Sequence, residues 1–408
     1  RNVRDVLRRH AHEAVERIAR GFWSHPSNRF EVGATDQERF DHLRELSLVF
    51  LYRLLFLLKA EAQNLLPMKD AEGRDTPYAK QASSDAVWQT VLAIDPADRA
   101  RSDRGFRLLK DLFDAVDSGA PMYGVPAYNG GLFDPDVHVE LARLSLPDDA
   151  VQAVLAALKY QDKDDPSPHL PVPYGDLEVR DLGDTYEGLL EQRLVATPDL
   201  GVPFQLCNQK GERKASGSYF TPDRLVEHLV RRTVEPLLAG AERDPHRILS
   251  LRVVDPAMGS GHFLVKVVDV MADWLTRHCD PIDPGVPNDD GPDELAYWKA
   301  KVAENCVYGV DYNPMSVELA KVALWLHTAR RDKPLSFLDH HLKVGNSLIG
   351  APLDRLNEPA LKLKTGRKDR TWEPKARVDI EVVRQAAAPV RAGRRPVQQG
   401  LGFRLDLG

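Results

Sequence analysis

Residues 252–265 read Arg-Val-Val-Asp-Pro-Ala-Met-Gly-Ser-Gly-His-Phe-Leu-Val, and this stretch decides the fold of the chain. Its β-branched start predicts a buried strand that ends at Asp255. The segment Gly259 to Gly261 then turns the chain, because glycine accepts positive φ and lets a ligand approach the backbone. From Phe263 to Trp274, apolar residues recur at helical spacing. A strand, a glycine turn and a helix form the first half of a nucleotide-type crossover unit, whose helix start directs free N–H groups at a ligand.

A second acidic residue, Asp311, follows the next predicted strand, Cys306 to Val310. In a doubly wound sheet the two strands are neighbours, and a carboxylate at this place accepts the ribose hydroxyls of a nucleoside. The two acids lie 56 residues apart, more than the roughly 20 usual in dinucleotide-binding proteins. An insert at 280–294 and a short helix at 295–303 account for the excess. Asn313 and Pro314 start the next helix, and a third strand follows within 335–350.

The carboxylate of Asp255 indicates which ligand suits this turn. It would face a pyrophosphate with a negative charge, which is unfavourable. No Gly-Lys-Ser/Thr follows the glycines either, so a Walker phosphate loop is excluded. S-adenosylmethionine carries an ammonium and a sulfonium and no phosphate. We therefore predict that the two acids and the glycine turn bind S-adenosylmethionine.

Composition predicts an ordinary globular protein with two or three domains. The chain has 408 residues, of which 43% are hydrophobic and 28% charged. Its three cysteines lie far apart without a Cys-x-x-Cys, which fits a reducing cytoplasm and argues against a disulfide framework or zinc ribbon. The most apolar run, 46–58, is too short to span a bilayer, so no membrane partner is expected. Because the chain begins with Arg, we expect that an N-terminal piece precedes it.

We predict three domains from the change in sequence texture. Residues 1–200 form a mostly α-helical N-terminal domain, centred on a helix at 40–66 that is apolar nearly all round and that Pro67 ends. Residues 201–352 form an α/β, Rossmann-like core. Residues 353–408 form a basic irregular segment.

The basic segment contrasts in charge with the rest of the chain. Residues 361–408 hold 12 Lys/Arg and 5 Asp/Glu, a net charge of +7, whereas the whole chain carries −6 and the remainder therefore −13. Charge runs of this kind are commonly solvated linkers. The alternative is a segment that contacts nucleic-acid phosphates.

Local signals also mark the junction between the first two domains. Residues 182–194 read as an amphipathic helix, and 195–215 read as a β-hairpin or an extended lead-in. A helix at 225–238 follows, with Thr221 as its N-cap and Pro222 as its first residue.

Four sequence blocks, in a fixed order, carry a family resemblance. They resemble the amino-DNA methyltransferases that place an aromatic-Thr-Pro block before the cofactor loop. The closest resemblance is to the large type IIG-like N6-adenine methyltransferases, including those of the phage-defence systems called DISARM and BREX. The loop 128–133 and the helix 182–191 also look like the N-terminal region of that group. The four blocks are Gly217–Pro222, Asp255–Phe263, Val307–Pro314 and Phe337–Leu348.

The resemblance implies a role in cofactor binding for each matching position. The block before the core would cover the methionine end of the cofactor, and it consists of Tyr219, Phe220, Thr221 and Pro222. The glycine block would hold the amino acid group, and it comprises Asp255, Ala257, Gly259, Ser260, Gly261 and Phe263. Asp311 would bind the ribose, with Tyr312 and Asn313 near the adenine, and Asn346, Ser347 and Leu348 would border the adenine ring.

The resemblance also implies an activity: a site-specific, adenine-specific DNA methyltransferase of a restriction-modification or phage-defence system. Its partners would be double-stranded DNA with a flipped adenine and, in addition, other subunits of the defence system. That family uses an Asn/Asp-Pro-Pro-Tyr/Phe block for catalysis, and residues 217–408 contain none. The catalytic residues are therefore unassigned. The resemblance further implies that residues 201–352 are a methyltransferase core that is incomplete, and that residues 353–408 lead to a missing C-terminal part. Cytosine N4, RNA and protein glutamine stay open as substrates, as do a non-catalytic DNA- or partner-binding subunit and a fused type IIG restriction endonuclease-methyltransferase.

Two weaker patterns were weighed against this interpretation. Asp339, His340 and His341 suggest a metal site, but consecutive side chains on a strand point to opposite faces, so no metal is predicted. Pro198-Asp199 with Glu212-Arg213-Lys214 fits the short pattern by which nucleases hold Mg²⁺. That pattern arises often by chance, and we do not favour a nuclease here.

Overall fold

The computed structural model describes residues 3–28, 36–128, 130–161, 170–190, 192–197, 203–208, 221–283, 292–328 and 338–348. Residues 1–347 form one compact unit and 348–408 a second. The predictions for the basic segment 353–408 and for the nuclease pattern lie outside the described residues. Over the described parts of the chain, every helix is too short or too polar to cross a lipid bilayer.

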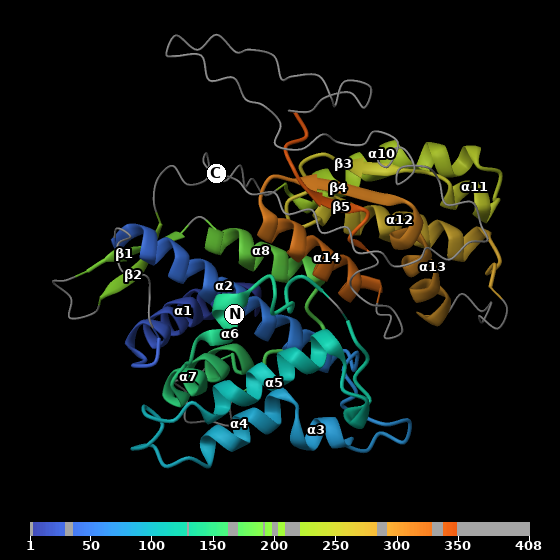
Figure 1. Cartoon of the computed structure of the whole chain (residues 1–408). Helices are drawn as coiled ribbons and strands as arrows, with labels where there is room; N and C mark the ends of the chain where they lie inside the picture. Colours follow the sequence, from blue (N-terminus) through green and yellow to red (C-terminus); the bar gives the residue numbers. More distant parts are fainter. Residues whose placement is uncertain are drawn as a thin grey trace, which may run out of the picture. The chain divides into compact units, whose positions relative to one another are not determined.

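The first half of the chain is a helical region built around one long helix, α2 (Figure 1). This helix is buried on all sides from Leu46 to Ala60, which confirms the predicted central helix. Phe50 and Phe56 contact other aromatic rings of the core. The helices of this region are α1 (Val3–Ser24), α2 (Asp36–Ala62), α3 (Pro77–Gln81), α4 (Ser84–Leu92), α5 (Arg104–Ser118), η1 (Pro121–Tyr123), α6 (Val139–Arg143) and α7 (Asp148–Lys159).

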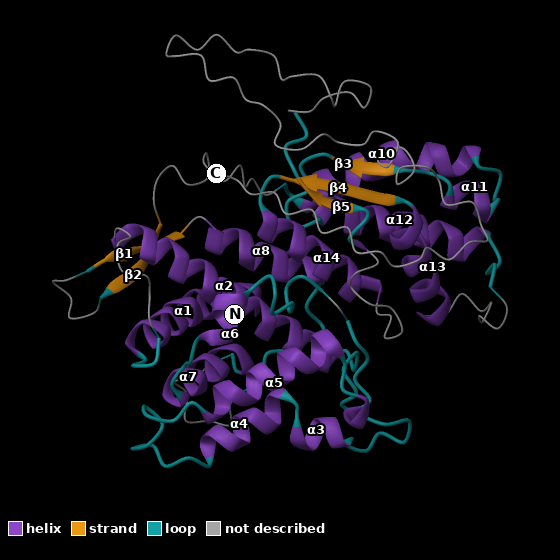
Figure 2. Cartoon of the chain, in the orientation of Figure 1, coloured by secondary structure: helices purple, strands orange, loops and turns teal. Residues whose placement is uncertain are grey.

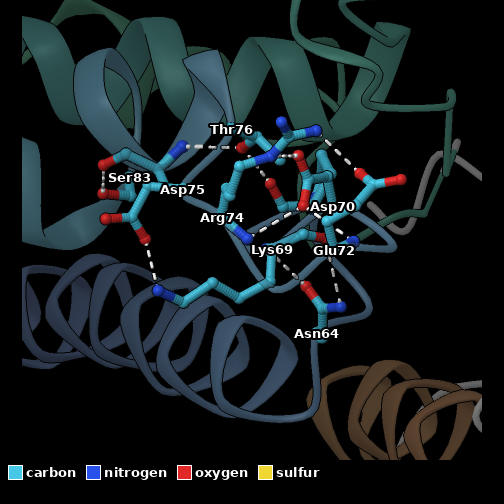
Figure 3. Close-up of polar contacts among 10 residues, drawn as sticks. Asn64, Lys69, Asp70, Glu72, Arg74, Asp75, Thr76 and Ser83 are labelled. Atoms are coloured by element: carbon cyan, nitrogen blue, oxygen red, sulfur yellow. Dashed lines mark hydrogen bonds and ion pairs between the residues drawn. The ribbon is translucent and has the colours of Figure 1, made fainter.

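Helix α2 ends at Ala62, earlier than the expected stop at Pro67. The reason is local, because Asn64 takes a left-handed conformation with φ of 53°, which ends a helix. The chain that follows is a polar turn closed by its own side chains (Figure 3). There the Asp70 carboxylate accepts the backbone N–H of Arg74 at 2.8 Å, and Thr76 caps α3.

Helix α8 (Val179–Leu190) and a two-stranded hairpin connect the helical region to the rest of the chain. Strands β1 (Gln192–Ala196) and β2 (Phe204–Asn208) pair antiparallel, with Leu194 opposite Leu206. This confirms the hairpin, but the helix predicted to Leu194 is wrong in its last residues. Leu194 is fully buried through this pairing, so tertiary contacts override the local helical pattern.

The second half of the chain holds a parallel sheet with the strand order β3-β4-β5 (Figure 2). Its strands are β3 (Val253–Asp255), β4 (Val307–Asp311) and β5 (Leu342–Val344). Helices α12 (His262–His278), α13 (Pro292–Asn305) and α14 (Pro314–Thr328) contact the sheet. Helix α10 (Asp223–Gly240) packs on α12, and α11 (Pro245–Leu249) precedes β3. The predicted neighbours β3 and β4 are thus adjacent and parallel.

The two faces of this sheet differ in burial. Val307, Gly309 and Leu342 lie on the face that α12 covers, and all three are buried. A Cβ at Gly309 would lie 2.1 Å from Met258 Sδ, so only glycine fits there. On the opposite face Val254 is 62% exposed. The helix-covered face therefore carries the packing of the sheet.

Helix α14 belongs to both apolar cores of the unit. Leu319, Val322, Ala323, Trp325 and Leu326 join the core of the helical region, whereas Val317, Ala320 and Leu324 join the core under the sheet. The ring of Trp325 stacks on Phe56 of α2, with centroids 5.4 Å apart. The helical region and the sheet therefore share one helix, and the domain boundaries near 200 and 352 stay predictions.

Candidate functional site

The glycine turn joins β3 to α12 in a conformation that its sequence requires. Asp255 ends the strand, and its carboxylate accepts the N–H of Ala257 at 3.0 Å. Met258 then donates its N–H to the carbonyl of Val310 on the neighbouring strand at 3.1 Å. Gly259 and Gly261 have φ of 54° and 87°, values that L side chains rarely adopt. Helix α12 starts directly after this turn, as the sequence predicted.

Gly261 has a second reason to be glycine. A Cβ at this position would lie 3.1 Å from the Cβ and 3.3 Å from the Cα of Ala320 on α14. Two small residues therefore let the start of α12 approach α14 closely. This contact fixes the direction in which the first turn of α12 presents its backbone N–H groups.

Asp311 lies at the end of β4 and holds the glycine turn directly. Its Oδ2 accepts the N–H of Gly259 at 2.9 Å, and its Oδ1 accepts the N–H of Asn313 at 2.9 Å. Both carboxylate oxygens are thus oriented by backbone donors. The structure therefore brings together the second predicted acid and the predicted glycine turn.

The two predicted acids also interact electrostatically. Burial raises the pKa of Asp255, the N–H of Ala257 opposes this, and the negative charge of Asp311 raises the pKa further. Two carboxylates whose charges disfavour each other create a place that favours a cation. This is the electrostatic character that the sequence predicted for the turn.

Two residues, the exposed Tyr312 and then Asn313, separate Asp311 from the start of α14 at Pro314. The Oδ1 of Asn313 accepts the N–H of Met315 at 3.0 Å, so Asn313 caps the helix. Pro314 occupies the first helical position, as expected. The Tyr312 side chain is 77% exposed, which leaves its ring face accessible beside the carboxylate of Asp311.

The turn after β5 approaches the same acid through the backbone. Gly345 donates its N–H to the carbonyl of Asp311 at 2.9 Å. Asn346, Ser347 and Leu348 follow and are exposed. The predicted residue group at the end of the third strand therefore begins next to Asp311.

The remaining predicted block precedes α10 and is described in part. Tyr219 and Phe220 lie outside the described residues, and Thr221 and Pro222 are visible. Pro222, with ψ of 136°, occupies the N-cap position and no side chain caps the helix, so the predicted Thr221 cap is wrong. Proline has extended backbone here, which shifts the helix start by one residue.

Comparison with known proteins finds the same region. Residues 179–348 match the sequence model of the family described as N-6 DNA Methylase. Residues 179–348 are therefore similar to an N-6 DNA methylase domain, and we use that description as the name of this region. This domain contains α8, the glycine turn, both acids and the turn after β5.

Two curated relatives match part of the chain. The putative type II restriction enzyme and methyltransferase of Methanocaldococcus jannaschii is 25% identical over 217 residues, covering 41% of this chain and 17% of the relative. The adenine-specific methyltransferase PglX of Streptomyces coelicolor is 26% identical over 234 residues, covering 53% of this chain and 16% of PglX. The chain thus spans about a sixth of the length of these relatives.

One solved structure is also similar to the chain. It is the methyltransferase subunit of a type I restriction-modification system from Streptococcus thermophilus. The TM-score is 0.29 and the identity 12%, over 88% of this chain and 61% of that subunit.

Two features of the N-6 DNA methylase domain were missed by sequence reasoning. The first joins the starts of two helices, because His262 Nε2 of α12 lies 3.3 Å from Asp223 Oδ1 of α10. The second is the contact of α8 with the glycine turn, where Gly183 faces Ser260. The only available signal was the occurrence of Gly183 inside a helical pattern, which usually has a packing reason.

A cavity of about 660 Å³ lies beside the start of α14. It is lined by Asn313, Pro314 and Met315 on the side of the methylase domain. Leu46 and Val49 of α2 and His138 line the other side. The helical region therefore contributes one wall of the space next to the predicted adenine position.

The histidines before β5 have a structural role. His341 donates from Nδ1 to the carbonyl of Val307 at 2.9 Å, and its ring stacks on Tyr308 with centroids 4.3 Å apart. In the described ranges, no group of three or more His, Cys, Asp or Glu could hold a metal ion.

Proposed function

We propose that the N-6 DNA methylase domain binds S-adenosylmethionine and serves methyl transfer to the N6 of adenine in DNA. The observation that carries this proposal is the bond from the Gly259 N–H to Asp311, beside the carboxylate of Asp255. It joins a glycine turn with two acids at the ends of neighbouring parallel strands. The family match and the adenine-specific methyltransferase PglX among the relatives support the choice of substrate.

The proposal includes the fold. The three parallel strands with α12, α13 and α14 would be one half of a Rossmann-like methyltransferase core. In such sheets, ligands bind outside the carboxyl ends of the strands. Asp255, Asp311 and Gly345 all lie at or just beyond these ends.

The residues of the site fit the chemistry of this cofactor. Asp311, held by two backbone N–H groups, would accept hydrogen bonds from the ribose hydroxyls. Asp255 would face the cationic methionine end, where neutralisation of its charge offsets the repulsion from Asp311. The exposed ring of Tyr312 would contact the adenine. When bound, S-adenosylmethionine supplies an electrophilic methyl group.

The other predicted positions complete this proposed binding mode. Tyr219, Phe220, Thr221 and Pro222 would cover the methionine end, and Ala257, Gly259, Ser260, Gly261 and Phe263 would shape the turn around it. Asn313, Asn346, Ser347 and Leu348 would border the adenine. We assign no catalytic residue in this chain.

The proposed substrate is double-stranded DNA whose target adenine leaves the duplex. Base flipping is required because the N6 of a stacked, paired adenine is inaccessible to a cofactor buried in a protein. We propose that the reaction takes place in the cytoplasm and serves a restriction-modification or phage-defence system, with other subunits of that system as partners.

A second candidate function is a non-catalytic DNA- or partner-binding subunit that keeps the cofactor pocket. One observation favours it: residues 217–408 lack an Asn/Asp-Pro-Pro-Tyr/Phe block. The two candidates share the cofactor site and differ only in whether a methyl group reaches DNA.

Titration calorimetry with S-adenosylmethionine tests the site. Asp311→Ala should weaken binding by about 10- to 100-fold, because hydrogen bonds to a charged group contribute about 1.5–3 kcal/mol. The matched control is Asp273→Ala, which removes a partly exposed acid of α12 that pairs with Arg277 one turn away. Wild-type protein that takes up no S-adenosylmethionine would refute the proposal.

A transfer assay then separates the two candidates. Duplex DNA is incubated with the protein and with S-adenosylmethionine that carries a tritiated methyl group. Tritium on the N6 of adenine supports the methyltransferase. A duplex already methylated at N6 is the control for the position of the label. If the full-length protein binds S-adenosylmethionine but transfers no methyl group to DNA, the result favours the binding subunit.

A further inference from the structure

Helix α8 approaches the glycine turn where Gly183 faces Ser260. We propose that Gly183 is a positioning residue, through which α8 sets the place of Ser260 and thereby the cofactor-binding turn. The proposal rests on the proposed function, because it concerns S-adenosylmethionine at that turn. It assigns a binding role to a helix that contains none of the predicted cofactor residues.

The first argument is that Gly183 is unfavourable for the helix itself. Gly183 lies inside α8, where glycine destabilises a helix by roughly 1 kcal/mol relative to alanine. A Cβ at this position would lie 2.9 Å from Ser260 Oγ and 3.4 Å from Ser260 Cβ. The missing side chain therefore lets α8 approach the turn closely.

The second argument is that the backbone of Ser260 cannot move without disturbing the turn. It lies between Gly259 and Gly261, whose left-handed conformations define the turn, and it is 8% exposed. The neighbouring Gly259 N–H donates to Asp311 at 2.9 Å. A displacement of Ser260 would therefore strain the bond that joins the turn to the second acid.

The third argument is that α8 is held in place by the helical region. Lys59 of α2 donates from Nζ to the carbonyls of Tyr174 and Leu177, at 2.8 and 2.6 Å, just before α8 begins. On α8 itself, the ring of Tyr186 contacts the ring of Tyr52 edge-on, with centroids 4.9 Å apart. A larger residue at position 183 would push Ser260 more easily than it would push α8.

The family match supports the same assignment. It begins at residue 179, where α8 begins, although the strand of the glycine turn starts only at Val253. Helix α8 therefore falls inside the N-6 DNA methylase domain, while its contacts tie it to the helical region.

The test compares two glycines of the same helix by calorimetry with S-adenosylmethionine. Gly183→Ala should raise the Kd about tenfold, because the new methyl group collides with Ser260. Gly188→Ala is the matched control, since a Cβ there meets nothing within 4 Å. The control should bind as wild type and melt about 1–2 °C higher, because alanine favours the helix.

A rescue experiment separates positioning from general damage. Ser260→Ala removes the Oγ that lies closest to the new methyl group and leaves only an ordinary contact at 3.4 Å. The double variant Gly183→Ala/Ser260→Ala should therefore bind S-adenosylmethionine as well as Ser260→Ala alone. A non-additive pair of this kind is the signature of a direct contact.

The outcomes are distinguishable. If wild type binds S-adenosylmethionine and Gly183→Ala binds equally well, the positioning role is overturned and the proposed function stands. If Gly183→Ala binds weakly and the double variant does not recover, the loss has another origin and the positioning role is again overturned. If wild type does not bind at all, the proposed function fails and the positioning role fails with it.

Discussion

The helical region and the sheet region bury their apolar side chains in different ways. In the helical region, large side chains fill the core, with Phe22, Phe50, Phe106 and Phe113 all buried and in contact as rings. In the sheet region, glycines allow close packing, because a Cβ would lie 3.1 Å from Ala320 at Gly261 and 2.1 Å from Met258 Sδ at Gly309.

This difference indicates that separate regions of the chain provide stability and the proposed ligand binding. Aromatic packing stabilises a fold but has no need for special backbone conformations. Gly259 and Gly261 have positive φ, which is useful where the backbone itself meets a ligand. The helical region is thus mainly a support, and the sheet region carries the site whose position it supports.

The largest effect is expected where the two regions meet, at Trp325. Trp325→Ala should destabilise the protein by about 3–5 kcal/mol, because a fully buried indole is lost from a packed core. Urea unfolding, followed by circular dichroism, measures this change. We expect one transition that includes both regions, and two separate transitions would show that α14 does not couple them.

A smaller loss is expected inside the sheet region at Gly309. Gly309→Ala would place a Cβ 2.1 Å from Met258 Sδ, and overpacking of this kind costs about 1–3 kcal/mol. Gly345→Ala is the matched control, because its Cβ would meet only Val310 Cγ1 at 3.6 Å. Equal melting temperatures for the two variants would contradict the difference between the positions.

The helical region should respond to pH through His138. Burial lowers the pKa of His138 to about 4, and the charge of Arg53 contributes. Below pH 6.5 the unfolded state takes up a proton that the folded state does not bind until about pH 4, so stability falls across this window. The expected loss is about 1–2 kcal/mol after allowance for screening at a partly exposed ring.

Urea unfolding at pH 7 and pH 5 measures this loss. The control is His138→Gln, which cannot titrate and should lose stability less steeply between the two values. An unchanged pH dependence in the variant would assign the effect to other groups.

The smallest effect is expected on the open face of the sheet. Val254 is 62% exposed, so Val254→Thr should change stability by about 0.5 kcal/mol or less. Val307→Thr, on the covered face, is the comparison, and burial of its hydroxyl should cost about 1–3 kcal/mol. Thermal melting of both variants compares the faces, and similar losses would mean that the outer face is also packed.

Sequence reasoning placed the glycine turn and the two acids at the ends of neighbouring strands, because their signals are local. The strand that ends at Asp255, the glycine turn and the strand that ends at Asp311 each show in a few consecutive residues, and the pairing of β3 with β4 follows from their order. The cap by Asn313 was visible in the same way.

The errors arose where contacts with residues far along the chain determine the local structure. The last residues of the predicted helix 182–194 form a strand because Leu194 pairs with Leu206. Pro222 replaced Thr221 as the cap because its extended backbone ends just before the helix. Neither the contact between Gly183 and Ser260 nor the double burial of α14 leaves a periodic signal that one sequence displays.

The position of α14 constrains how this protein can be recombined with its relatives. A chimera that exchanges the methylase domain at a junction after α8 would bring a foreign α14 against the resident α2. In this protein, that surface of α14 contains Leu319, Val322 and Trp325. The corresponding surface of the foreign helix would have to pack against the resident Phe56 and Tyr128. Functional hybrids should therefore be those in which this surface of α14 is inherited together with the N-terminal helices, whatever cofactor-side residues they carry.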